Sequence, residues 1–313
     1  MKLPYELRDM RPATLGALMK DSVGQWSKHR ASSKGAALSL YMIFSLAPML
    51  ILVIAVAGFF FGEEAVQSQL VAQLRDLMGD RGAEVIQTVL ASAHESDSGL
   101  MATLISIGVL IFSATTAFAE LQASLDELWE IPEREQPAGI MGFIKSRFLS
   151  FGLVLVLALF LLMSLSVNAA LAAAKGYYGE WWANSVFATT AGIVANLFAF
   201  TVVAALFAVI YKLLPSTRIS WRDVIPGAIV TAGLFLIGKW GIGLYLGQGG
   251  IADAYGAAGS VVALLLWIYY SAQIFFFGAV FTRQFAERFG SKAHAERKRA
   301  RADMPPPDIH PAV

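Results

Sequence analysis

Residues 257–282 read AAGSVVALLLWIYYSAQIFFFGAVFT, a run of uncharged and mostly apolar side chains. A helix of about 20 such residues spans the hydrocarbon core of a bilayer. The run lacks the two-residue alternation of a barrel strand, and a helix bonds all its backbone groups internally in lipid. Five other segments are similarly apolar, at 35–61, 99–119, 148–174, 183–211 and 224–246, and only the last of these contains a charged residue, Lys239. The sequence therefore predicts an all-α, polytopic membrane protein with six transmembrane helices.

The composition of the whole chain supports a membrane protein. Of its 313 residues, 57% are hydrophobic and only 15% are charged, whereas soluble domains carry about 25% charged residues. The chain has no cysteine, which excludes disulfides and thiolate metal sites. Its histidines lie far apart, at positions 29, 94, 294 and 310. We therefore expect no metal and no cofactor.

Lysine and arginine indicate the orientation of the spans. Twenty of them lie in the N-terminal segment, in the loops 120–147 and 212–223, and after residue 282, against three in the other loops. Positive residues favour the cytoplasmic side, so we expect both termini there, as an even number of spans requires. The basic segment 1–34 does not resemble a cleavable signal peptide, so the first span should remain in the mature protein. A six-helix membrane domain over 35–290 and a disordered cytoplasmic tail over 291–313 should follow.

The first outer loop, 62–98, is too long to be a simple connector. Its apolar residues recur at helical spacing on both sides of a break at 79–82, which predicts two amphipathic helices on the outer face. They could form a lid or partner surface, or simply pack on the bundle. The second span should continue as a helix over 120–131 and end before Pro132. The positions that carry these two patterns are Val66, Leu70, Leu74, Leu77, Val85, Ile86, Val89 and Leu90 in the loop, and Leu121, Leu125 and Leu128 after the second span.

Three long stretches resemble the YihY/BrkB family of bacterial inner-membrane proteins. They are ALSLYMIFSLAPMLILVIAVAGFFFG at 37–62, FSATTAFAELQASLDELWEI at 112–131, and the segment 213–286, which begins LLPSTRISWRDVIPG. The resemblance covers about residues 20–290 and implies a location in the bacterial inner membrane. The family carries an old ribonuclease label and a virulence-factor label. Its members commonly have Glu where this chain has Val280, so any role of that Glu is lost or moved here.

The residues themselves argue against a ribonuclease. A metal-dependent nuclease needs clustered carboxylates or histidines, and here the acids lie mostly in 63–98 and 120–135, on opposite sides of the membrane. Both loops are acidic overall and would repel a phosphate backbone. We therefore expect no catalytic residues and no nucleic-acid partner.

Lys239 is the only charged residue deep in a predicted span, and such residues are functional candidates. The glycine-rich turn that follows contains Asp253 and Tyr255, and Gly259 and Ser260 open the last helix. Free N–H groups at a helix start can bind an anion, so we predict that Lys239 and this helix start form one anion site. Alternatively, Lys239 extends to the outer headgroups, the glycines serve close packing, and Asp253 caps the helix or pairs with Lys239.

Other polar residues within the spans could form a hinge or line a cavity. Pro48 should kink the first span, with Ser45 near the same face. Thr116 and Glu120 share one face of the second span. Asn196 and Gln273 lie in the fourth and sixth spans, where buried amides usually join helices.

These features favour a transporter or flippase-like translocator. Its partners would be membrane lipids and an amphipathic anionic substrate such as a lipid. The alternative is a non-catalytic envelope scaffold whose outer helices recruit partners. A polar cavity open to one side or to lipid would favour the translocator, and a tightly packed interior would favour the scaffold.

Overall fold

A computed structural model of the chain describes residues 12–94, 116–132, 186–217, 219–248, 255 and 258–290. Across these residues the structure is helical and contains no strand, as the sequence predicts. Residues 116–128 form one helix. The others are α1 (Pro12–Lys28), α2 (Ala31–Phe61), α3 (Glu63–His94), α6 (Val186–Leu213), α7 (Trp221–Gln248) and α9 (Gly259–Arg288).

Three of the described helices are long and apolar enough to cross a membrane. The qualifying segments are Asn196–Leu213 of α6, Trp221–Ile242 of α7 and Val261–Arg288 of α9. α2 contains the whole first predicted span. The second and third predicted spans fall almost entirely outside the described residues, so the total of six remains a prediction.

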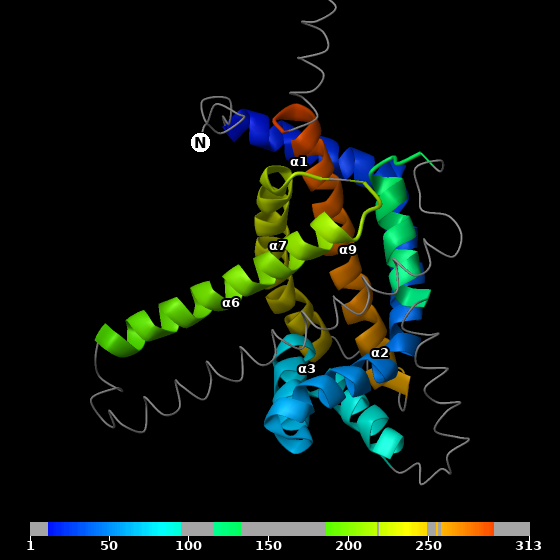
Figure 1. The fold of residues 1–313 in the computed structure, drawn as a ribbon, viewed down its shortest axis with the longest axis vertical. Coiled ribbons are helices and arrows are strands. Elements are labelled where there is room, and N and C mark those ends of the chain that lie inside the picture. The colour runs from blue at the N-terminus through cyan, green and yellow to red at the C-terminus, as the bar shows by residue number, and fades with distance from the viewer. Residues whose placement is uncertain are drawn as a thin grey trace, which may run out of the picture.

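The helices α7 and α9 run antiparallel through the middle of the bundle (Figure 1). α9 also contacts α1, α2 and α3, which makes it the most widely contacted of the labelled helices. α6 packs on α7 and leans away from the bundle toward its own N-terminal end (Figure 1). Its side chains at Ile193, Val194 and Leu197 are consequently exposed. An exposed apolar helix face of this kind suits lipid rather than water.

Glycine allows the close approach of α7 and α9. A Cβ added at Gly227 of α7 would overlap the hydroxyl of Thr282 on α9, and a Cβ at Gly278 of α9 would overlap the hydroxyl of Thr231 on α7. Each threonine thus fills the space that a glycine leaves on the other helix. The hydroxyls bond back within their own helices, from Thr231 to the Gly227 carbonyl and from Thr282 to the Gly278 carbonyl, both at 2.7 Å. Small residues bring membrane helices together in this way without leaving polar groups unpaired.

The larger two of the three groups of buried side chains join most of the described helices. One joins α2, the 116–132 segment, α6, α7 and α9, and includes Leu125, Tyr211 and Phe276. Val280 lies in this group and is only 1% exposed, so an apolar side chain suits the position where relatives of the predicted family commonly have Glu. The other group joins α2, α3 and α9 around Ile86.

The prediction of two outer helices broken at 79–82 is wrong, because α3 is one helical element from Glu63 to His94. A glycine inside a helix costs only about 1 kcal/mol relative to alanine, and the contacts of α3 with α2, α7 and α9 compensate for that cost. The predicted apolar face is confirmed where it is described, since Val66, Leu70, Ile86 and Leu90 are all at most 5% exposed. Packing on the bundle, the simpler of the two alternatives, therefore describes this element.

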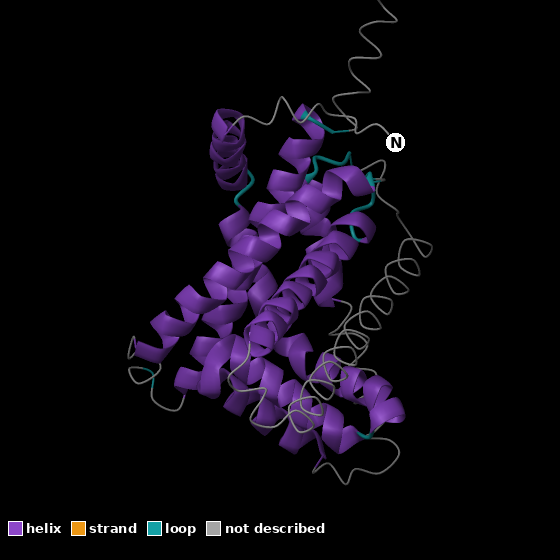
Figure 2. Ribbon diagram, turned by 90° about the vertical axis from the view of Figure 1, so that its left-hand side faces the viewer, coloured by secondary structure: helices purple, strands orange, loops and turns teal. Residues whose placement is uncertain are grey.

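The described segments that the charge pattern assigns to one side of the membrane lie at the same end of the bundle. α1, the 214–217 turn and the end of α9 lie at one end of the bundle, and α3 lies at the other (Figure 1). Figure 2 shows the described loops as short connections at the ends of helices. The end that carries α1 is called the α1 end below. It collects the described parts of the segments rich in lysine and arginine, and its cytoplasmic location remains a prediction.

Candidate functional site

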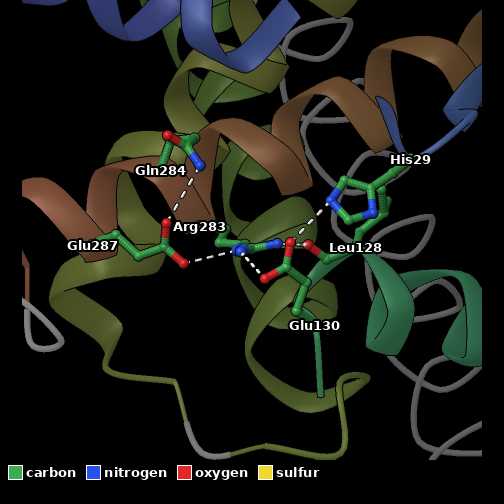
Figure 3. A network of polar contacts seen from close by, with 6 residues as sticks. All are labelled: His29, Leu128, Glu130, Arg283, Gln284 and Glu287. Atoms are coloured by element: carbon green, nitrogen blue, oxygen red, sulfur yellow. Dashed lines mark hydrogen bonds and ion pairs between the residues drawn. The ribbon is translucent and has the colours of Figure 1, made fainter. Parts of the chain in front are cut away.

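The described polar contacts concentrate at the α1 end, around Arg283 in the last turns of α9. Its side chain is 9% exposed and uses all three guanidinium nitrogens (Figure 3). Nη1 donates to the Leu128 carbonyl at 2.9 Å, Nη2 lies 2.6 Å from Oε2 of Glu130, and Nε donates to Oε1 of Glu287 at 2.8 Å. Gln284 donates to the other oxygen of Glu287 at 3.3 Å. The guanidinium thereby ties α9 to the end of the 116–128 helix.

Glu130 occupies a left-handed backbone conformation, with φ 50°, where the 116–128 helix has ended. The helix thus ends a few residues earlier than predicted, and the turn directs the carboxylate toward Arg283. The hydrogen bond from Arg283 lowers the pKa of Glu130, although partial burial opposes this shift. Nε2 of His29 lies 3.2 Å from Oε1 of Glu130 without hydrogen-bond geometry, and it forms an ion pair only when the imidazole is protonated.

The 116–132 segment is tied to further elements by its other acids. Glu127 pairs with Lys34 of α2. Asp126 is 3% exposed and accepts two hydrogen bonds from Ser216, from the backbone nitrogen at 2.7 Å and from the hydroxyl at 2.6 Å. Gln122 donates to the same hydroxyl at 3.3 Å. We call the contacts of Arg283, Glu130, Glu127 and Asp126 the ionic clamp.

The ionic clamp joins α2, the 116–132 segment, residue 216 and α9. Asp126 is bonded to Ser216 and Glu127 to Lys34, so neither belongs to a cluster of acids that could hold an ion. No group of three metal-binding side chains occurs among the described residues. The arrangement of these carboxylates gives the ribonuclease hypothesis no support.

The residues of the predicted anion site are only partly described. Lys239 is half-buried on α7, Gly259 is the buried first residue of α9, and Tyr255 is 60% exposed. Asp253 and the side chain of Ser260 lie outside the described part of the chain. This site remains a prediction.

The helix register limits what the predicted anion site could bind. A Cβ at Gly238 of α7 would meet Tyr270 and Ile274 of α9, which places Lys239 level with about residue 271. Gly259, at the start of α9, precedes residue 271 by about 12 residues, which is roughly 18 Å along the helix axis at 1.5 Å per residue. A lysine side chain reaches only roughly 6 Å from its Cα by its bond lengths. A single phosphate therefore cannot contact both groups, although a ligand of phospholipid length could.

The predicted hinge and cavity residues lie on four elements, namely α2, the 116–128 helix, α6 and α9. Pro48 lies within α2, and the buried hydroxyl of Ser45 donates to the Tyr41 carbonyl of its own helix at 3.0 Å. Thr116 and Glu120 are half-buried on the 116–128 helix.

The two membrane amides differ in their surroundings. Gln273 of α9 lies against Gly35 of α2, and its Nε2 donates to the Ser32 carbonyl at 3.4 Å, so it joins two helices as expected. Asn196 is exposed, and the expectation that it is buried between helices is wrong. The physical reason is the lean of α6, which turns its first half away from α7 (Figure 1).

Sequence reasoning missed Arg283, Glu130 and Tyr211 as structural residues. The Tyr211 hydroxyl is fully buried and bonds to the Phe275 carbonyl at 2.7 Å and to Thr231 Oγ1 at 3.1 Å. One signal for the ionic clamp was available, because Arg283 directly follows a long uncharged span and Glu287 lies one helical turn beyond it. The Tyr211 contacts leave no such signal in the sequence.

Comparison with known proteins identifies the family. The family model described as Virulence factor BrkB matches residues 22–303. A UPF0761 membrane protein of Pseudoalteromonas translucida is 24% identical over 276 residues, which are 86% of this chain and 88% of the relative. Another from Kangiella koreensis is 24% identical over 267 residues, covering 85% and 63%. One from Pseudomonas aeruginosa is 27% identical over 257 residues, covering 80% and 58%.

The chain thus spans about three-fifths of the length of two of these relatives. No solved structure matches it. Because the family model covers most of the chain and agrees with its long apolar helices, this protein is a membrane protein that belongs to the virulence factor BrkB family.

Proposed function

We propose that this protein is an inner-membrane translocator for an amphipathic anionic substrate, of the class of a phospholipid. The observation that carries the proposal is Lys239, half-buried within the apolar segment of α7 that is long enough to cross a membrane. A lysine at that depth is costly, and it persists where a ligand or pathway uses it. An anionic headgroup passing along α7 would be attracted to it more strongly than in water, since the surrounding dielectric is low.

The separation between Lys239 and the start of α9 favours a long substrate over a simple anion. The register sets these groups roughly 18 Å apart along the helix axis, which is of the order of half a bilayer. A phospholipid could place its headgroup at one position while its chains remain beside the exposed face of α6. Passage of such a substrate needs no nucleophile and no metal.

Lipid movement in vesicles tests this proposal. Purified protein is reconstituted with fluorescent phosphatidylglycerol or phosphatidylcholine, and an impermeant reductant reports how fast the label reaches the outer leaflet. We expect faster movement of phosphatidylglycerol with protein than without it. Lys239→Ala should slow this movement roughly tenfold, which corresponds to a barrier that is higher by about 1.4 kcal/mol. Lys239→Arg should retain most of it.

Arg222→Ala is the matched control, because it removes a positive charge from the first turn of the same helix. It should leave the rate unchanged. Protein that moves neither lipid faster than empty vesicles would overturn the proposal, and equal rates for Lys239→Ala and the wild type would remove Lys239 from it.

A non-catalytic envelope scaffold is the second candidate. The tight fit of Gly227 against Thr282 and of Gly278 against Thr231 favours it, because this part of the interior leaves no room for a substrate. A scaffold would give wild-type vesicles no lipid movement.

A further inference from the structure

α1 presents two different apolar surfaces, and the bundle covers only one of them. Leu18 and Ser22 are fully buried, and Leu18 packs with Phe281 and Phe285 of α9. On the other surface Leu15, Met19 and Val23 follow one another at four-residue spacing and are 39%, 37% and 54% exposed. We call these three side chains the α1 stripe.

The α1 stripe lies beside the buried face of the helix and not opposite to it. At 100° per residue, the stripe centres on Met19, about 80° round the helix from the midpoint of Leu18 and Ser22. Lys20 is exposed about 180° from that buried midpoint and about 100° beyond Met19, whereas Lys28 is exposed directly opposite Met19. Around α1 the order is therefore bundle, apolar stripe and Lys20, which is the order of environments that a helix meets in a membrane interface.

The position of α1 in the fold agrees with an interfacial helix. It lies across the end of α9 instead of extending along it (Figure 1). α7 begins at the same end, with Trp221 49% exposed and the Lys212 ammonium 5.9 Å from its ring centroid. Tryptophan and lysine together are typical of the headgroup level of a membrane protein.

The charge around the α1 stripe identifies the lipid. Lys20, Lys28 and Arg30 are exposed, while Asp21, the one acid of α1, is paired with Arg288 of α9. Exposed basic residues near an anionic leaflet are attracted to its negatively charged headgroups. A zwitterionic surface would offer no comparable term, and a protein partner would have to match both the cations and the narrow apolar stripe.

We infer that α1 is an interfacial helix whose Leu15, Met19 and Val23 side chains enter the headgroup–acyl boundary of an anionic lipid leaflet, with Lys20 toward its phosphates. This surface is separate from Lys239 and does not depend on lipid translocation. It fixes the end of α9 to the membrane through the packing of Leu18 and the Asp21–Arg288 pair.

Site-specific fluorescence tests the inference, and the chain has no cysteine to remove. Full-length Met19→Cys and Val23→Cys carry a small polarity-sensitive label on the α1 stripe. Ala17→Cys is the matched control, because Ala17 is exposed on the same helix but faces away from both the stripe and the core. The proteins are reconstituted in phosphatidylcholine vesicles with or without phosphatidylglycerol, with iodide on both sides of the membrane.

In vesicles that contain phosphatidylglycerol, we expect a shallow nitroxide lipid to quench the labels at Met19 and Val23. Iodide should quench these two labels several-fold less than it quenches the label at Ala17. Without phosphatidylglycerol, iodide quenching at the stripe should increase. Equal iodide quenching at all three positions would overturn the inference. Protection of the stripe from both quenchers would also overturn it, because a protein surface would then cover the stripe. A stripe equally protected in both kinds of vesicle would refute the requirement for anionic lipid.

Discussion

Arg283 shows how a single charged residue can be held at the edge of a membrane segment. Its guanidinium is 9% exposed yet has a partner for each nitrogen, two of them carboxylates. A buried cation is tolerated only when it is paired and fully hydrogen-bonded. The chemistry of Arg283 could be anticipated from the sequence, but its main partners, Leu128 and Glu130, are about 155 positions away along the chain.

Removing the Arg283 side chain should destabilise the protein more than removing a neighbouring surface arginine. Arg283→Gln leaves the Leu128 carbonyl and Glu130 without the guanidinium, while Glu287 keeps its hydrogen bond from Gln284. We expect the free energy of unfolding to fall by about 2 kcal/mol, less than for a fully buried pair because Glu130 is half-exposed. Arg288→Gln breaks the more exposed pair with Asp21 and should cost about 0–1 kcal/mol.

Chemical unfolding in detergent, followed by circular dichroism, measures both variants. Equal losses for the two would show that the contacts of Arg283 contribute no more than a surface ion pair.

At the scale of elements, the sequence predicts helices better than it predicts how they meet. The described close contact between α7 and α9 uses Gly227 and Gly278, each followed by a threonine four residues later. The glycine–threonine spacing is visible in the sequence of each helix. The sequence does not show the antiparallel register that sets each threonine against the glycine of the opposite helix, because packing along the whole of α7 and α9 decides that register.

Gly278→Ala should force α7 and α9 apart. The new methyl group would overlap the hydroxyls of Thr231 and Tyr211, neither of which can move without breaking a buried hydrogen bond. Overpacking of this kind costs typically about 1–3 kcal/mol. The matched control is Gly233→Ala on α7, where no atom lies within 4 Å of the added Cβ.

The control should be neutral, or stabilising by up to about 1 kcal/mol, because alanine favours the helix. Thermal unfolding in detergent compares the two variants. A neutral result for Gly278→Ala would mean that the helices separate at no cost and that their close contact is not needed.

At the scale of the whole molecule, hydropathy predicts the class of protein, and the distribution of lysine and arginine predicts which helix ends lie on the same side of the bundle. Helices of more than 25 residues and the gathering of basic segments at the α1 end follow from composition along the chain. The lean of α6 does not, because a uniformly apolar helix carries no pattern that says which part of it faces protein and which faces lipid. The exposed position of Asn196 follows from that lean.

The two ends of the molecule should lie on opposite sides of the bacterial inner membrane. Ser27 of α1 and Ser68 of α3 are both exposed, and they belong to opposite ends of the bundle. In spheroplasts an impermeant maleimide should label Ser68→Cys and not Ser27→Cys, because positive residues favour the cytoplasm. After lysis both should react. Labelling of Ser27→Cys alone before lysis would reverse the orientation.

The position of α9 in the chain has a consequence for how the protein is made. Segments leave the ribosome in order, and earlier ones begin to fold first. Arg283 and Arg288 belong to the last described helix, whereas Asp21, Leu128 and Glu130 are synthesised well before it. The α1 end therefore cannot close while the nascent chain is still short of α9. The arginine contacts of Glu130 and Asp21 therefore form only after α9 has been synthesised, so a chain interrupted before α9 would present these two acids to the quality-control proteases of the cell without their arginine partners.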